Sequence, residues 1–184
     1  MKRLLFSLLV VAGAAAAQNT NEPRDVTANT RSSEWEERQR RDPSDAGVVL
    51  PALPKNENLI EFWVSNSTAF RFFIDAASLS VDKEGVVRYT LVARSPSGVA
   101  NTSYEGMRCT AGLYKIYAYE RGGQWSATTS DWRPVEPNAI QRWHNELRLR
   151  YFCADRRGSL LSKEEGLDAL RRGGHPGAGA RGAY

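Results

Sequence analysis

His144 and His175 are the two histidines of the chain, and neither lies in a motif for metal-dependent, serine-based or phosphate-binding chemistry. His144 falls on the apolar face of a predicted helix, so we interpret it as a packing histidine, with a general base as the alternative. His175 lies in a glycine-rich tail, which is a poor place for a preorganised base. With the two cysteines assigned to a disulfide, as argued below, the two histidines are too few ligands for a zinc site, and we predict no metal and no cofactor.

Carboxylates could carry a second kind of chemistry. Glu105, Asp131 and Glu136 could converge in space as the acid and base of a small hydrolase. The chain has 21 acidic residues, so three of them carry little information on their own. Whether the protein is an enzyme therefore stays open, with the missing catalytic motifs counting against it.

The most distinctive stretch of the sequence alternates polar and aromatic side chains. Tyr104, Glu105 and Arg108 supply an aromatic face and both signs of charge, while Gly106 permits a bulge or a close backbone approach. Trp132 could line the same surface. We predict that Tyr104, Glu105, Arg108 and Trp132 form a binding surface, in which Arg108 contacts a carboxylate or phosphate. The alternative is structural, with Glu105 and Arg108 forming an ion pair and Tyr104 lying in the core.

The N-terminus has the pattern of a secretory signal peptide over residues 1–17. Lys2 and Arg3 precede the apolar stretch Leu4–Ala12, and a run of small residues follows, so we predict cleavage between Ala17 and Gln18. About 14 apolar residues are fewer than the roughly 20 that span a membrane, although an uncleaved anchor is the alternative. We therefore expect a periplasmic protein whose mature chain has no transmembrane span.

Export determines how the cysteines are interpreted. Cys109 ends a predicted strand and Cys153 follows a predicted helix, and both would meet an oxidising compartment. We predict a structural disulfide between them. The bond would close a loop of about 45 residues and stabilise the fold by roughly 4 kcal/mol. A redox-active pair is the weaker alternative, because such pairs favour the Cys-x-x-Cys spacing.

Composition divides the mature chain into three parts. Residues 18–47 hold few large apolar side chains and are predicted to be a flexible linker. Residues 48–157 form the predicted α+β domain. Residues 158–184 are predicted to be a short helix, opened by a capping box at Ser162–Glu165, and a disordered glycine-rich tail. The hydrophobic fraction of 41% excludes a disordered chain, and the net charge of +4 is too small to indicate nucleic-acid binding.

We expect the domain to be a single twisted antiparallel sheet of about five or six strands, with one C-terminal helix packed on a face. The clearest strand is Val86–Arg94, where apolar and polar side chains alternate. The other expected elements are an extended strap at Val48–Pro54, strands at Leu59–Val64, Thr68–Ile74, Val99–Cys109 and Leu113–Tyr119, and a helix at Ala139–Phe152. On that helix Ile140, Trp143, His144, Leu147 and Tyr151 share one face.

Several stretches of this domain together resemble a known family. They are Leu50–Pro54, Phe73–Asp75, Ser78–Val81, Gly85–Val92, Ser103–Cys109, Tyr114–Ala118, Trp125 and Trp132. In this combination the sequence resembles the CNP-one-like family, small exported proteins of proteobacteria with no assigned activity. The resemblance covers about residues 33–155. It implies an exported single domain, and it carries over no catalytic or binding residue.

The function expected from the sequence is that of a non-catalytic binding or accessory module of the cell envelope, whose partner is an unknown envelope component. A small carboxylate-dependent hydrolase is the first alternative. The second is a binder of anionic envelope surfaces, because basic residues are concentrated in the C-terminal tail. These are Arg156, Arg157, Arg171, Arg172 and Arg181.

Overall fold

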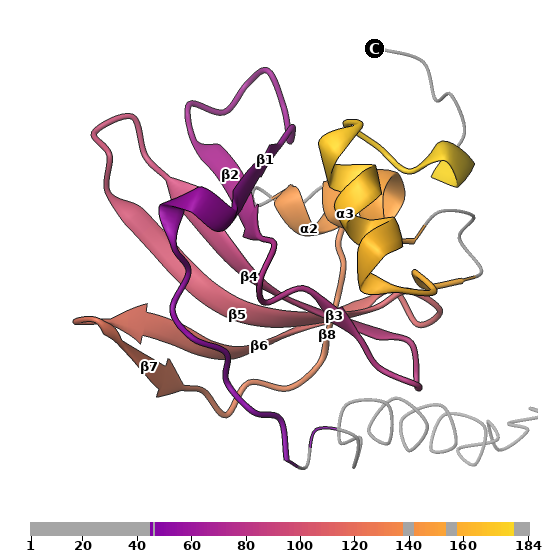
Figure 1. Cartoon of the computed structure of the whole chain (residues 1–184), viewed down its shortest axis with the longest axis horizontal. Helices are drawn as coiled ribbons and strands as arrows, with labels where there is room; N and C mark the ends of the chain where they lie inside the picture. The colour runs from indigo at the N-terminus through magenta and orange to yellow at the C-terminus, as the bar shows by residue number, and fades with distance from the viewer. Residues whose placement is uncertain (1–44, 46, 138–141, 154–157, 179–184) are drawn as a thin grey trace, which may run out of the picture.

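The structure, a computed structural model, describes residue 45 and residues 47–137, 142–153 and 158–178. In this part of the chain, eight antiparallel strands form one sheet in the order β1-β2-β4-β5-β6-β7, with β3 paired to β4 and β8 paired to β6 (Figure 1). The strands are β1 Leu59–Phe62, β2 Arg71–Asp75, β3 Ser80–Val81, β4 Val86–Arg94, β5 Ala100–Arg108, β6 Leu113–Arg121, β7 Gln124–Ala127 and β8 Arg133–Pro134. The expected number of five or six strands was too low, because the two-residue strands β3 and β8 are too short to show an alternating pattern.

The expectation of one C-terminal helix is also corrected. The helical segments are α2 Trp143–Glu146, the π-helical segment η3 Leu147–Phe152, α3 Lys163–Arg171, and the 3-10 turns η2 Asn56–Asn58 and η4 Pro176–Ala178. Half of the capping box is present, since the Ser162 hydroxyl accepts a hydrogen bond from the Glu165 N–H, while the Glu165 carboxylate accepts one from the Leu161 N–H. The first residues of the predicted helix, 139–141, lie outside the described residues.

The π-helical turn explains how one short segment buries so many side chains. Leu147 and Tyr151 are buried, as the helical spacing predicted, and Phe152 and Cys153 are buried as well. The N–H of Cys153 donates to the carbonyl oxygen of Arg148, five residues earlier, at 3.1 Å. This wider turn brings two consecutive residues to the sheet, where an ordinary α-helix would have turned one of them away.

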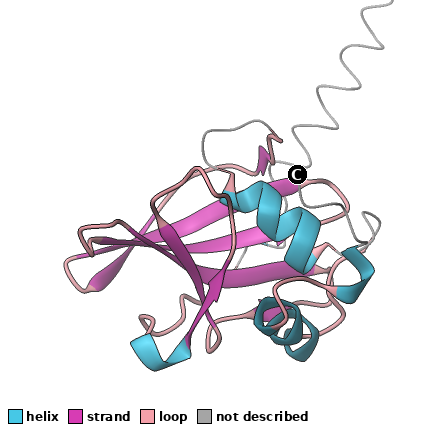
Figure 2. Cartoon of the chain, turned by 90° about the horizontal axis from the view of Figure 1, so that it is seen from above, coloured by secondary structure: helices cyan, strands magenta, loops and turns pink. Residues whose placement is uncertain are grey.

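The two faces of the sheet are covered differently. On the helix face, α2, η3 and α3 lie close against the strands (Figure 2), and the shared core includes Phe62, Ile74, Tyr89, Leu91, Met107, Leu147, Tyr151 and Phe152. The opposite face carries the strap, which is Asp45 together with residues 47–55. In Figure 1 the strap, in indigo, runs across β5 and β6 toward η2. A second core lies beneath it, made by Val86, Tyr104, Tyr117, Ala118 and Trp132.

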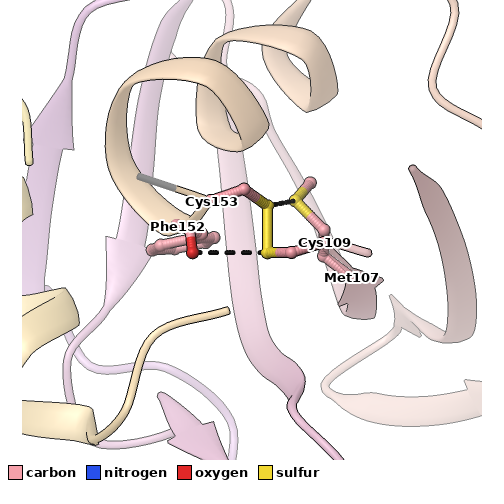
Figure 3. The surroundings of a disulfide bond; sticks show 4 residues. All are labelled: Met107, Cys109, Phe152 and Cys153. Atoms are coloured by element: carbon pink, nitrogen blue, oxygen red, sulfur yellow. Dashed lines mark hydrogen bonds between the residues drawn. A yellow bond between two sulfur atoms is a disulfide. The ribbon is translucent and has the colours of Figure 1, made fainter. Parts of the chain in front are cut away.

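The predicted disulfide between Cys109 and Cys153 is present. It joins the residue after β5 to the residue after η3, with a Cα–Cα distance of 5.3 Å and a sequence separation of 44 (Figure 3). Both cysteines are buried. The Cys109 sulfur lies 3.3 Å from the Phe152 carbonyl oxygen, a packing contact because a disulfide sulfur has no proton to donate. The bond therefore ties the helical layer to the sheet.

The folded unit continues past residue 157, where we expected the domain to end. Leu160 and Leu170 belong to the core on the helix face, and α3 packs against β1 and η3. Part of the predicted tail is also ordered, since the N–H of His175 donates to the carbonyl oxygen of Arg150 at 2.6 Å. Apolar side chains at helical spacing in α3 complete a core that the sheet and η3 leave open.

The folded unit also begins before residue 48. Asp45, within the predicted flexible linker, accepts hydrogen bonds from three side chains of the strap face. The predicted signal peptide, residues 18–44 and 46 of the linker and residues 179–184 of the tail lie outside the described residues.

The burial of α3 predicts a large effect of shortening one of its leucines. Leu170 is 2% exposed, and Leu170→Ala should lower the free energy of unfolding by about 2–5 kcal/mol, as expected for a cavity in a core. Leu161 lies just before α3, is 91% exposed and serves as the matched control. Leu161→Ala should change the free energy of unfolding by less than about 0.5 kcal/mol. Urea denaturation measures both. Similar effects of the two substitutions would contradict the packing of α3.

Candidate functional site

The four residues predicted to form one binding surface are divided between the two faces of the sheet. Side chains alternate along β5, so Tyr104 faces the strap with Trp132, while Glu105 faces the helices. All four side chains are more than nine-tenths buried. The structure therefore brings Tyr104, Arg108 and Trp132 to one side without exposing them, and it places Glu105 on the other side.

Arg108 is held by an aromatic ring. Its guanidinium carbon lies 4.2 Å from the centroid of the Trp132 ring, a close cation–π contact, and the residue is 8% exposed. Gly106 makes this packing possible, because a Cβ atom there would lie 2.8 Å from the Tyr117 hydroxyl and 3.2 Å from the Trp132 ring. The close approach that the sequence predicted at Gly106 is present, and it serves aromatic packing.

Glu105 is the centre of a buried polar cluster, the Glu105 cluster, with Ser103, Tyr114 and His144. One carboxylate oxygen of Glu105 accepts a hydrogen bond of 2.6 Å from the Ser103 hydroxyl, and the other lies 2.8 Å from Nε2 of His144. The imidazole of His144 stacks on the Tyr114 ring, with centroids 3.7 Å apart. Glu105 is 1% exposed and His144 is 4% exposed. The cluster is thus closed to solvent.

The order of hydrogen bonds in the Glu105 cluster does not fit nucleophilic catalysis. In a serine–histidine–carboxylate triad, the histidine lies between the other two groups and takes the proton of the serine. Here the carboxylate lies in the middle and Ser103 donates to it directly. Asp131 and Glu136, the other members of the predicted carboxylate group, are exposed and do not join Glu105. The interpretation of His144 as a packing histidine is therefore the one that the geometry favours.

The two histidines provide a matched test of this role, because each has a nitrogen 2.8 Å from a glutamate. His144→Leu should lower the free energy of unfolding by about 3–5 kcal/mol, since it leaves the Glu105 carboxyl buried without its partner. His175→Leu breaks a more exposed pair with Glu165 and should cost about 1 kcal/mol. Denaturant titration of both variants measures the difference. Equal losses would contradict a structural role specific to the Glu105 cluster.

A second polar site lies at the surface, where the strap passes the turn between β3 and β4. This strap pocket has a volume of about 360 Å³. Tyr104 and Arg88 contribute to it from adjacent strands, since Arg88 lies diagonally across from Tyr104 in the β4–β5 register. Its complete lining is Gly47, Val48, Val49, Ser80, Asp82, Lys83, Glu84, Arg88 and Tyr104.

Arg88 is the best-positioned charge of the strap pocket. One of its terminal nitrogens donates to Asp82 at 2.6 Å, its guanidinium carbon lies 5.8 Å from the centre of the Tyr117 ring, and its side chain is 11% exposed. Nε of Arg88 is buried without a hydrogen-bond partner among the described residues. The guanidinium therefore keeps donors that its own ion pair does not use.

Asp82 orients this arginine and is itself firmly held. Its carboxylate also accepts hydrogen bonds from the backbone N–H groups of Glu84 and Val86, each at 2.9 Å. Burial raises the pKa of Asp82, but the Val86 N–H and the Arg88 guanidinium outweigh burial and lower the pKa overall. The carboxylate therefore stabilises the fold above its ordinary pKa, and this contribution is lost as the pH falls through the lowered value.

Sequence reasoning missed Arg88 and Asp45 as site residues. The alternation in Val86–Arg94 placed Arg88 on the polar face of its strand, which is correct, but that face would normally meet solvent. Here the strap lies next to that face, so Arg88 lines a pocket. Within the described residues, no three His, Cys, Asp or Glu side chains gather closely enough to hold a metal ion.

In the described residues, the fold and its sites define a small sheet domain with a buried polar cluster on one face and an open pocket on the other. A family model, that of the CNP1-like family, matches residues 30–171, well over half of the chain. The chain therefore belongs to the CNP1-like family, the CNP-one-like family that the sequence resembles. Comparison with curated proteins and with solved structures gave no match.

Proposed function

We propose that this protein is an exported, non-catalytic binding module of the cell envelope. The observation that carries the proposal is the contrast between its two polar sites. Glu105 and His144, the described pair best suited to acid–base chemistry, are closed inside the core, whereas the polar groups of the strap pocket surround an open hollow. A site that a ligand can enter, but that pairs no nucleophile with a base, favours binding over reaction.

Export is supported by the N-terminal pattern and is consistent with the disulfide. A buried disulfide between Cys109 and Cys153 is typical of proteins that fold in an oxidising compartment. None of the helices in the described residues has the length and apolar character needed to cross a bilayer. The disulfide fits a protein that is released into the periplasm after cleavage.

Export predicts a defined mature N-terminus. Periplasmic material should begin at Gln18, as measured by intact-protein mass spectrometry, because Ala15 and Ala17 provide the small side chains that signal peptidase accepts. Ala17→Arg should block cleavage and leave the precursor bound to the membrane, whereas Asn19→Arg, just beyond the cut, should not. Mature material that begins at Met1, or that stays in the cytoplasm, would overturn export.

The chemistry of the strap pocket favours a small anionic group as its ligand. The four charged side chains of the pocket, Asp82, Lys83, Glu84 and Arg88, cancel in charge, so long-range attraction contributes little. Recognition would instead come from hydrogen bonds, since the guanidinium of Arg88 suits a carboxylate or a phosphate and Tyr104 and Ser80 offer hydroxyl groups. We expect the bound group to be a carboxylate or phosphate carried by an envelope component.

This ligand class can be tested with acetate and inorganic phosphate as probes of the mature protein. Either anion should shift the amide NMR resonances of Val48, Val49 and Lys83 in a saturable manner, with a Kd of about 1 mM or weaker because the contact is small. Arg88→Gln should weaken binding at least about ten-fold, since it removes the charge-assisted hydrogen bonds. The preference between the two probes distinguishes a carboxylate ligand from a phosphate ligand.

Arg94 provides the control for this experiment. It lies on the same strand and the same face as Arg88, but outside the strap pocket, where it bonds to Asn56 at 2.8 Å. Arg94→Gln should leave the probe response unchanged. If neither probe shifts the pocket resonances of the wild-type protein, the proposed anion site is wrong.

The two alternative functions have less support. A carboxylate-dependent hydrolase would need Glu105 or His144 at a surface, and both are buried. For a binder of anionic surfaces, Arg171 and Arg172 are exposed on α3, but Arg172 is paired with Asp168 at 2.8 Å. The remaining tail arginines, at positions 156, 157 and 181, lie outside the described residues. No observation favours either alternative over the binding module.

A further inference from the structure

The strap is attached to the sheet by side chains rather than by strand pairing. Among the described residues, no backbone hydrogen bond joins the strap to a strand. Pro51 and Pro54 cannot donate one, because proline has no N–H. Near these prolines the strap is held by a side chain of the sheet. The indole N–H of Trp125 donates a hydrogen bond to the carbonyl oxygen of Pro51 at 2.7 Å. The strap could therefore detach while the strands of the sheet stay paired.

The surface beneath the strap is lined by aromatic rings, and we call it the strap groove because the strap lies over it. The ring centroids of Tyr104 and Tyr117 are 5.7 Å apart, those of Tyr104 and Trp125 are 6.3 Å apart, and those of Tyr117 and Trp132 are 6.3 Å apart. Val48 and Leu50 of the strap pack onto this surface. The strap groove consists of Tyr104, Lys115, Tyr117, Trp125 and Trp132.

At one end of the strap groove, three side chains together bind a carboxylate. The Asp45 carboxylate accepts hydrogen bonds from Trp132 Nε1 at 2.8 Å and from Lys115 Nζ at 3.0 Å on one oxygen, and from the Tyr117 hydroxyl at 2.9 Å on the other. Trp132 is 1% exposed and Tyr117 is 7% exposed, so their donors would lose a partner in the interior without this carboxylate. Three converging donors, one of them cationic, select for a negative charge.

The strap itself shows what the groove recognises. Pro51 and Pro54 form a Pro-x-x-Pro spacing, and an acidic residue lies six positions before the first proline. Proline-containing segments are extended before they bind, so they lose little entropy when they dock. Grooves lined by aromatic residues commonly bind such segments, and their side chains donate hydrogen bonds to the carbonyl groups of the peptide. The Trp125 bond to the Pro51 carbonyl has this chemistry.

We propose that the strap groove is a recognition site for extended, proline-containing peptide segments with an acidic residue, and that the strap is its intramolecular occupant. A partner protein that presents such a segment displaces the strap. Its carboxylate takes the place of Asp45 on Lys115, Tyr117 and Trp132, and its backbone carbonyl takes the Trp125 indole. This inference goes beyond the anion site of the strap pocket, because it concerns a different class of ligand and the aromatic surface beneath the strap, which shares Tyr104 with the pocket.

Two features of the strap fit an occupant that can leave. Gly47 has a φ of +89°, and a Cβ atom there would meet nothing within 4 Å, so this point of the strap borders open space. Val49 is 84% exposed and contributes little to the attachment. Because the strap is tethered, it competes at a millimolar effective concentration, and a free peptide should bind weakly until the strap is loosened.

The test uses a synthetic peptide with the sequence of residues 45–54 and blocked ends, added to the mature protein. Asp45→Ala loosens the strap by removing its carboxylate. This variant should bind the peptide at least about ten-fold more tightly than the wild type does, because the tethered competitor is weakened. The indole N–H resonances of Trp125 and Trp132 in NMR spectra report the binding and should move toward their wild-type positions.

Three controls make the result specific. A peptide with asparagine in place of its aspartate should bind about ten-fold more weakly, and a scrambled peptide should not bind. Adding Trp125→Phe to the Asp45→Ala variant keeps an aromatic ring but removes the donor to the peptide carbonyl, so it should also weaken binding. If Asp45→Ala does not fold, Asp45→Asn, which keeps the shape of the side chain, takes its place in the same measurements.

Two outcomes would overturn the proposal. The first is a folded Asp45→Ala or Asp45→Asn variant that binds the peptide no more tightly than the wild type does. The second is a variant that forms a dimer and binds no peptide, because a second copy of the chain would then cover the strap groove. The acetate and phosphate titrations of the wild-type protein report the anion site without any peptide, so failure here and failure of the anion site are distinguishable.

Discussion

The pairing of β4 with β5 is the constraint on which the rest of the structure depends. All nine residues of each strand are paired, so the face of every side chain follows from one register. Tyr89, opposite Glu105, faces the helices, while Arg88 and Tyr104 face the strap. A shift of one residue would expose the Glu105 cluster and bury the strap pocket in the helical core.

The two faces that this register creates are closed in different ways. On the helix face, the disulfide, the π-helical turn and α3 pack a continuous core around Glu105 and His144. Burial first, and then the charge of Glu105, raise the pKa of the Tyr89 hydroxyl at the edge of that cluster, so it stays protonated. On the strap face, single side-chain contacts hold an extended segment over aromatic rings. Stability belongs mainly to the first face, and the surfaces suited to binding belong to the second.

Several of these features could be predicted because they are local. The strand Val86–Arg94 was predicted with its observed bounds, since period-two alternation is a property of the chain itself. The buried helix face of His144, Leu147 and Tyr151 followed from helical spacing in the same way. The disulfide followed from the even cysteine count and the export signal. The two-residue strands β3 and β8 could not be predicted, because they are defined by their pairing to a longer neighbouring strand.

The sequence by itself determined the longer strands, the family, the disulfide and the extended character of the strap, because each rests on composition, motif or neighbouring residues. Only the tertiary structure decided which side chains share a site. It placed Arg88 rather than Arg108 beside Tyr104, and it brought Asp45 onto Lys115, Tyr117 and Trp132, 70 to 87 residues further along the chain. Contacts of that range depend on register and on the path of the strap, which no local pattern encodes.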